Sequence, residues 1–155
     1  MISELKNLSN SELELLNKAP LLVCILIAGA DGEIDRKEIK EAIATAKKKA
    51  SSTNSLREFY ENVSEDFEDK LKVLVHSYPT MPHQRGQTIS VELAGLNKIF
   101  SKVKGHLSIE IYESLISLAL NIAKSSGGVF GLKTIGTEEA RFVELKMIDP
   151  PTGLS

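Results

Sequence analysis

The stretch Ala28-Gly-Ala-Asp31-Gly-Glu33-Ile34-Asp35-Arg-Lys-Glu38 decides the fold, because an apolar run ends here and acidic residues take over. The preceding run, Leu21–Ala30, contains no charged residue. Four carboxylates then follow within eight residues, and Ile34 is the only apolar residue between them. This change predicts a buried helix, a tight turn at Gly32 and a second helix that begins near Asp35.

The residues after the turn have the pattern of a capped amphipathic helix. Asp35 with Glu38 predicts a capping box, in which each side chain accepts a hydrogen bond from a backbone N–H near the helix start. Apolar residues then recur at helical spacing, and Lys47–Lys49 place positive charge where the C-terminal end of the helix dipole favours it.

The rest of the chain also shows helical periodicity. Ser11-x-x-Glu14 has the form of a capping box, and Pro20 predicts that this helix stops and that a new one starts near Ala19. A strand is the alternative for the apolar run, but no other segment offers it a sheet partner. The expected helices span 11–18, 19–30, 35–49, 56–78 as one helix or two, 89–103, 109–124 and 137–149, with loops at 79–86 and 125–136.

These patterns predict an all-α protein of about seven helices in one domain, residues 1–155. The net charge of −2 argues against a nucleic-acid-binding protein, which would carry a basic patch. The single cysteine, Cys24, excludes an internal disulfide and predicts an inert core thiol in a cytoplasmic protein. We expect no signal peptide, and no transmembrane segment because the apolar run is shorter than the roughly 20 residues that span a bilayer.

Two parts of the sequence share a plan, which predicts an internal repeat. Ile-Ala28 before the first turn matches Ile-Ala123, and Ile34-x-x-x-Glu38 after it matches Ile135-x-x-x-Glu139. The two matches differ in offset, which implies an insertion of about six residues, roughly 129–134, in the second turn. We therefore expect half-repeats at about 11–78 and 88–149, in which two helical hairpins pack as a compact bundle with both apolar helices against each other. Chance similarity is the alternative, since helix–glycine–helix is common.

The acidic turn suggests a divalent metal site. Asp31, Gly32 and Glu38 would be positions 5, 6 and 12 of an EF-hand loop, but positions 1 and 3 would be Ile27 and Gly29, which lack side-chain oxygens. A standard EF-hand is therefore excluded, and what remains is a set of oxygen ligands for Mg²⁺, Ca²⁺ or Mn²⁺. The alternative is that the Asp35–Glu38 pair only caps the helix.

Asp31 differs from the other carboxylates because it follows the C-terminal end of a helix. The helix dipole disfavours a negative charge there, so we expect a compensating cation or hydrogen-bond donor.

The sequence Ala-Asp31-Gly-Glu-Ile-Asp35-x-x-Glu38 after an apolar helix, echoed at Glu139, resembles the tellurite-resistance TerB-like family over roughly residues 21–148. The resemblance implies an all-helical cytoplasmic protein of two related halves, associated with tellurite resistance and stress responses. It implies metal ligands at Asp31, Asp35, Glu38 and Glu139. The chain departs from the family at Ser126-Gly127-Gly128, where members often repeat Asp-Gly, and this puts a second, symmetric metal site in doubt.

Three functions therefore compete. The first is a TerB-like stress protein that binds a divalent cation. The second is a non-catalytic helical protein–protein interaction module without metal, which leaves open a protein partner or a homo-oligomer. An enzyme ranks last, because no acid–base or nucleophile pattern can be identified and His76, His83 and His106 lack metal-ligand spacing.

Overall fold

The protein is an all-α bundle, as predicted. The computed structural model describes residues 2–29, 34–50, 54–127 and 144–151. Within these ranges it contains seven α-helices, one short 3-10 helix and no β-strand. The elements are η1 (Ser3–Leu5), α1 (Asn10–Ala28), α2 (Arg36–Lys49), α3 (Asn54–Ser64), α4 (Phe67–Ser77), α5 (Pro82–Ala94), α6 (Leu96–Phe100) and α7 (Leu107–Gly127).

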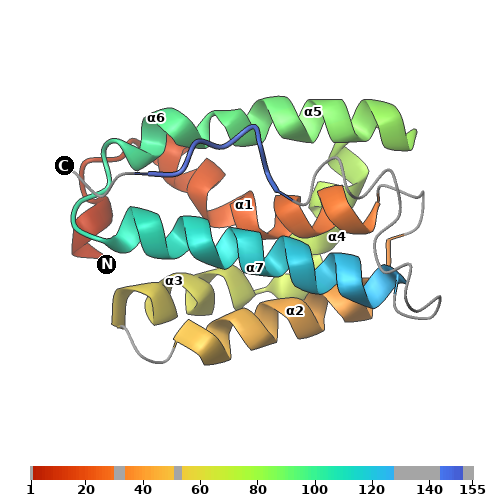
Figure 1. The fold of residues 1–155 in the computed structure, drawn as a ribbon, viewed down its shortest axis with the longest axis horizontal. Coiled ribbons are helices and arrows are strands. Elements are labelled where there is room, and N and C mark those ends of the chain that lie inside the picture. The colour runs from red at the N-terminus through yellow and green to blue at the C-terminus, as the bar shows by residue number, and fades with distance from the viewer. Residues whose placement is uncertain (1, 30–33, 51–53, 128–143, 152–155) are drawn as a thin grey trace.

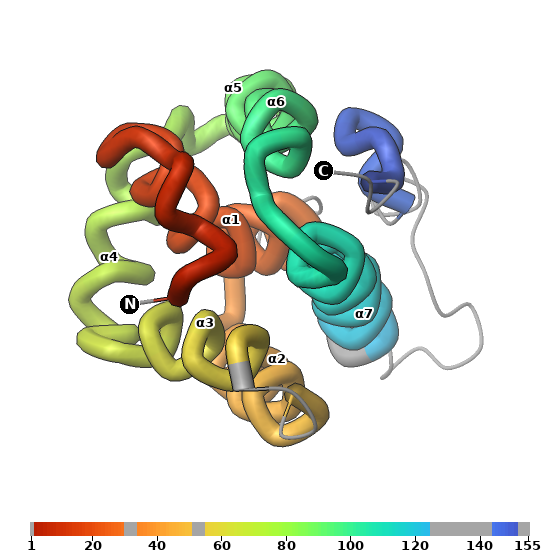
Figure 2. Tube along the Cα trace, turned by 90° about the vertical axis from the view of Figure 1, so that its left-hand side faces the viewer, coloured from red at the N-terminus to blue at the C-terminus, as the bar shows by residue number. Residues whose placement is uncertain are grey.

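Helix α1 is the centre of the bundle. It contacts each of the other six α-helices, which surround it as Figures 1 and 2 show. Every residue from Ala19 to Ala28 is buried, so this part of the helix has no solvent-facing side. A helix that is apolar on all sides is stable only inside a core, and α1 takes that place because its neighbours bury it from every direction.

The N-terminal cap of α1 lies two residues earlier than the sequence predicted. The Ser9 side chain accepts a hydrogen bond from the Glu12 backbone N–H at 3.2 Å, and the Ser9 N–H donates to the Glu12 carboxylate at 2.9 Å. Ser11 with Glu14 has the same spacing, but Leu8 before Ser9 is buried, in the position of a hydrophobic staple. Burial of Leu8 therefore selects the first of two overlapping cap patterns.

The predicted break at Pro20 is wrong, because α1 continues through it as one helix. Proline removes the N–H that would bond the carbonyl of Leu16, which costs a helix interior about 3 kcal/mol. Leu16 and Ala19 before the proline and Leu21 after it are all buried in the same core. Burial on both sides of Pro20 offsets the lost hydrogen bond.

The structure also decides whether 56–78 is one helix or two, and it shortens the expected loop at 79–86. The region 56–78 forms two helices, separated by Asp66 in the left-handed conformation at a φ of 52°. The expected loop at 79–86 is wrong after Met81, because α5 starts at Pro82. Proline is favourable in the first turn of a helix, and Arg85 and Gly86 are buried there against the bundle.

The C-terminal part agrees with the prediction in one respect and differs in another. The two apolar helices, α1 and α7, pack against each other as the internal repeat would require. Most of the expected final helix, 137–149, lies outside the described residues, but Glu144–Asp149 forms turns and not a helix. Asn97 holds this segment on α6, since its side chain donates to the Met147 carbonyl at 3.1 Å and accepts from the Asp149 N–H at 2.7 Å. The repeat itself stays a prediction.

Candidate functional site

The Asp35 side chain caps α2, as the sequence predicted. Its Oδ1 atom accepts hydrogen bonds from the backbone N–H of Lys37 at 2.9 Å and of Glu38 at 3.3 Å. Lys47–Lys49 occupy the last turn of the same helix, also as predicted. Asp35 is exposed, and both of these bonds reach one of its two carboxylate oxygens. Asp35 therefore has a structural role and keeps one oxygen outside the cap.

The predicted metal ligands are only partly placed. Asp31 and Glu139 lie outside the described residues, whereas Asp35 and the half-buried Glu38 begin α2. Among the described residues, no three His, Cys, Asp or Glu side chains are grouped so that they could hold a metal ion. The four-ligand metal site thus stays a prediction, because the structure places only Asp35 and Glu38.

A buried arginine lies at the C-terminal end of α1. Arg85 of α5 is 7% exposed, and its guanidinium donates to the Gly29 carbonyl at 2.7 Å and to the Thr80 carbonyl at 3.2 Å. Burial lowers the pKa of this guanidinium. Gly29 is the C-cap of α1, so Arg85 supplies positive charge where the helix dipole is negative. Sequence reasoning missed Arg85, since nothing local links it to a residue 56 positions earlier.

Gly29 must be a glycine for Arg85 to approach. A Cβ at this position would lie 2.6 Å from Arg85 Nη2 and 2.8 Å from the Ile25 carbonyl oxygen. These distances are shorter than any ordinary contact of a Cβ atom. The glycine before the acidic turn therefore admits the guanidinium, whereas the donor predicted to compensate Asp31 stays a prediction because Asp31 lies outside the described residues.

The first candidate binding surface is a groove of about 510 Å³ between α1 and α4. Leu21, Val73 and Leu74 supply its apolar lining, and Val73 is 62% exposed. Polar residues form the rest of the lining: Glu14, Asn17, Lys18, Asp69 and Lys70. The groove is therefore an apolar strip with charged borders.

The lysines of the α1/α4 groove have partners within the protein, whereas its carboxylates have none among the described residues. Lys18 forms an ion pair with Glu92 of α5, and the Lys70 ammonium donates to the Asn62 carbonyl at 2.7 Å. Glu14 and Asp69 are exposed and form no hydrogen bond or ion pair with other described residues. The two cations are thus bonded to other groups of the protein, and the two carboxylates are available to a partner.

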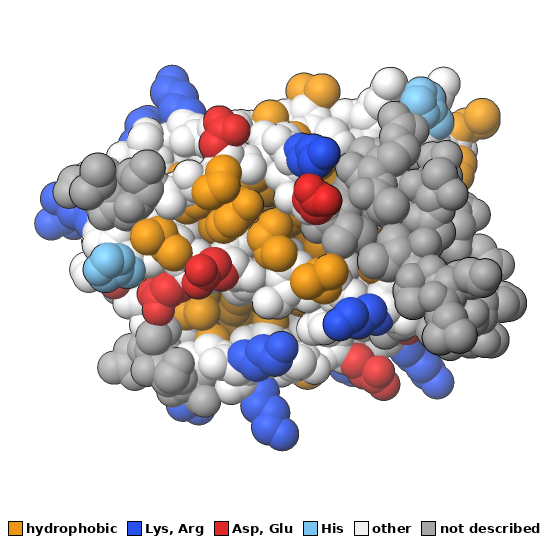
Figure 3. All heavy atoms as spheres, viewed as in Figure 1, with side chains coloured by type: hydrophobic (Ala, Val, Ile, Leu, Met, Phe, Trp, Pro, Cys, Tyr) orange, Lys and Arg blue, Asp and Glu red, His pale blue; other side chains and the backbone are white. Residues whose placement is uncertain are grey.

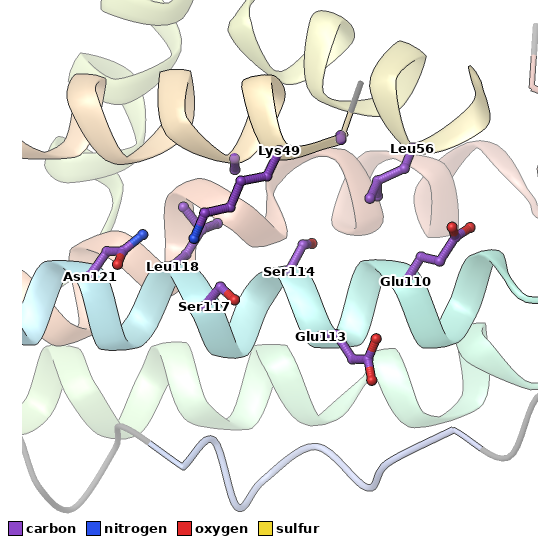
Figure 4. Close-up of a pocket in the computed structure, with 10 residues that line it drawn as sticks. Lys49, Leu56, Glu110, Glu113, Ser114, Ser117, Leu118 and Asn121 are labelled. Atoms are coloured by element: carbon purple, nitrogen blue, oxygen red, sulfur yellow. The ribbon is translucent and has the colours of Figure 1, made fainter. Parts of the chain in front are cut away.

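A second groove, of about 240 Å³, lies between α7 and the pair α2 and α3 (Figure 4). Ala46 of α2, its C-cap Ala50, Leu56 of α3 and Leu118 of α7 line it with apolar atoms. The polar lining consists of Lys49, Glu110, Glu113, Ser114, Ser117 and Asn121. This groove combines charges of both signs with hydroxyl and amide groups.

Ser114 is fixed in that groove by two hydrogen bonds. Its hydroxyl donates to the Ile111 carbonyl at 2.6 Å, so the Tyr60 hydroxyl, also at 2.6 Å, must be the donor in their shared bond. Tyr60 is fully buried, and burial raises its pKa. The Tyr60 phenol thus holds one residue of the groove in place from inside the core.

Hydrophobic side chains also gather on the face of the molecule that Figure 3 shows, over α7 and the C-terminal segment. A shallow depression there is lined by Tyr112, Glu113, Ile116 and Glu144. Leu120, on the same helix, is 37% exposed.

The remaining candidates have ordinary surroundings. Cys24 is fully buried, as predicted, and burial raises its pKa. The three histidines are exposed, and His76 Nδ1 lies 2.8 Å from the Lys72 carbonyl oxygen of the same helix.

In the described part of the chain no helix is long and apolar enough to cross a membrane. Comparisons with known protein families, with curated proteins and with solved structures found no match.

Proposed function

We propose that this protein is a non-catalytic interaction module that binds a basic amphipathic helix of a partner protein in the α1/α4 groove. The observation that carries the proposal is the pairing of an apolar groove lining, in which Val73 is exposed, with carboxylates that have no partner among the described residues. An amphipathic helix binds such a groove through its apolar face, while its cationic residues meet the carboxylates at the border.

The surface next to the groove supports a basic partner. Residues 58–69, at the corner between α3 and α4, contain six acidic residues and no lysine or arginine. Glu68 pairs with Lys40 at 3.6 Å, but most of the negative charge at this corner is exposed. A patch of one sign attracts a partner of the opposite sign and speeds association at low salt.

The test uses two designed helical peptides with the same apolar face, one lysine-rich and one glutamate-rich, titrated into the ¹⁵N-labelled protein. We expect the lysine-rich peptide alone to shift amide signals of α1 and α4. Val73→Lys should weaken binding about tenfold or more, because a valine buried at the interface contributes about 1.5 kcal/mol and the new charge repels the peptide.

Val91→Lys is the matched control, since Val91 is 76% exposed on α5 and does not line the groove. Equal binding of both peptides, or equal loss in the two variants, would contradict the proposal.

A second candidate function is divalent-cation binding at the acidic turn, in a TerB-like protein associated with tellurite resistance and stress responses. It is favoured by the Asp35 carboxylate, which is exposed and uses only one oxygen for the helix cap. Its ligands for Mg²⁺, Ca²⁺ or Mn²⁺ would be Asp31, Asp35, Glu38 and Glu139. Oxygen donors of this kind suit these hard cations.

Thermal unfolding of metal-free protein tests the cation proposal. A cation at 100 times its dissociation constant should stabilise the wild type by about 2.7 kcal/mol and leave Asp31→Ala unchanged. Asp69→Ala is the control, since it removes a carboxylate on α4. Absence of a shift with all three cations would exclude this function.

A further inference from the structure

Helix α7 carries a polar stripe where a core helix has no need of one. Glu110, Ser114, Ser117 and Asn121 follow at spacings of four, three and four residues, so they lie along one face of the helix. The helix is otherwise mostly apolar and packs on α1. The stripe faces α2 and α3, which also contact α7, and all four residues line the groove between these helices.

Small residues at the C-terminal end of α2 keep this groove open. Ala46 and Ala50 stand opposite the stripe, and a larger side chain at either position would fill the space between α2 and α7. Leu118, which is fully buried, and Leu56 give the groove an apolar base. The groove can therefore shelter a ligand's uncharged middle from water.

Four polar side chains of the groove have no partner among the described residues. The side chains of Lys49, Glu110, Ser117 and Asn121 make no hydrogen bond or ion pair with the described residues, in contrast to the doubly bonded Ser114. Partly enclosed polar groups that lack protein partners are the groups that a ligand can satisfy.

The two charges lie toward opposite ends of the groove. Figure 4 shows Glu110 beside Leu56 at one end, whereas Lys49 reaches across from α2 to the level of Leu118, next to Asn121. Glu113 also lines the groove, with its carboxylate directed away from Lys49 in Figure 4. A ligand of a single sign would be repelled at one end, so the arrangement favours a molecule with a positive and a negative terminus.

We propose that this groove binds a small zwitterion whose ammonium group meets Glu110 and whose carboxylate meets Lys49. Lys49 reaches the level of Leu118, which follows Glu110 by eight helical residues, a rise of about 12 Å. A tripeptide in extended conformation is about 10 Å long, and a hydrogen bond at each terminus covers the remaining distance. The expected ligand class is therefore a short linear peptide with free termini, about three residues long, and not a single amino acid.

The test titrates trialanine into the ¹⁵N-labelled protein and follows amide shifts. We expect shifts in the last turn of α2 and along residues 110–121 of α7, with free alanine binding much more weakly. Blocking either terminus of trialanine, by acetylation or amidation, should weaken binding about tenfold, the typical effect of one charge-assisted hydrogen bond.

Protein variants assign each charge to one terminus. Glu110→Gln should weaken trialanine binding about tenfold but leave binding of the acetylated peptide unchanged, and Lys49→Met should do the same with respect to the amidated peptide. Lys48→Met is the control, because Lys48 is exposed on the same turn and does not line the groove. The blocked peptides test the proposal even if a variant is unstable.

Three results would overturn it: no groove shifts at millimolar trialanine, equal binding of free and blocked peptides, or equal losses in the Lys48 and Lys49 variants. The α1/α4 groove is formed by other residues, so this proposal and the proposed function fail or succeed separately.

Discussion

Replacement of Arg85 by methionine tests the contact that holds the end of the central helix. Methionine keeps an unbranched apolar stem of similar length and removes the guanidinium, which is 7% exposed and bonds the carbonyls of Gly29 and Thr80. Gly29 is itself buried, so we expect little water to replace the donor at its carbonyl.

The magnitude follows from three contributions. A hydrogen bond from a charged donor contributes about 1.5–3 kcal/mol, and the 3.2 Å bond to Thr80 belongs at the lower end. The favourable interaction with the C-terminal end of the α1 dipole adds about 0.3–1 kcal/mol. Removal of a buried charge returns part of its desolvation cost. We expect Arg85→Met to lower the free energy of unfolding by about 2–3 kcal/mol.

Equilibrium unfolding in guanidinium chloride, followed by circular dichroism, measures this change, and the melting temperature should fall by roughly 4–12 °C. Arg57→Met, at an exposed arginine of α3, should stay within about 0.5 kcal/mol of the wild type. A variant at Arg85 as stable as the wild type would refute the assigned role.

Gly29→Ala extends the same test. Its Cβ would lie 2.6 Å from Arg85 Nη2, so alanine must displace the guanidinium. We therefore expect the two substitutions to be non-additive, with a coupling of about 1 kcal/mol or more in a double-mutant cycle. Strict additivity would show that the two residues do not interact.

Three other outcomes follow from the structure. Asp35→Ala should lower the free energy of unfolding by about 1 kcal/mol, measured by thermal unfolding, because it removes the cap of α2. Burial raises the pKa of Tyr60 above its ordinary value of 10.0. Above about pH 10 the unfolded chain therefore binds fewer protons than the folded protein, and the free energy of unfolding falls by up to about 1.4 kcal/mol per pH unit. Denaturant titrations up to pH 11 should show a smaller loss for Tyr60→Phe than for the wild type. Asn97→Ala should speed hydrogen exchange at the Asp149 amide, measured by NMR, because that N–H loses its acceptor.

Local sequence patterns predicted the helical fold class better than the positions where individual helices begin and end. The period of apolar residues identified the helical class, since it reflects which face of each helix is buried. The same reasoning failed at Pro20 and at residues 82–86, where proline alone suggested a break or a loop. In both places burial against distant helices decides the conformation, and a sequence window contains no information about those neighbours.

Among the site residues, local contacts could be predicted from the sequence and contacts between helices could not. The Asp35 cap could be predicted because donor and acceptor lie within three residues of each other. The contact of Arg85 with Gly29 joins different helices, so only the assembled bundle reveals it. The polar stripe on α7 is visible in the sequence as a periodicity, but the groove that it lines is formed by α2 and α3.

The central position of α1 has a consequence for synthesis on the ribosome. Its buried run ends at Ala28, whereas α7, which packs on it, begins at Leu107, about 80 residues later. At 5–20 residues per second, roughly 4–16 s pass before the covering helix is translated. During this interval the most apolar helix of the nascent chain lacks a major part of its cover. The growing polypeptide therefore presents a binding segment for chaperones well before the bundle can close.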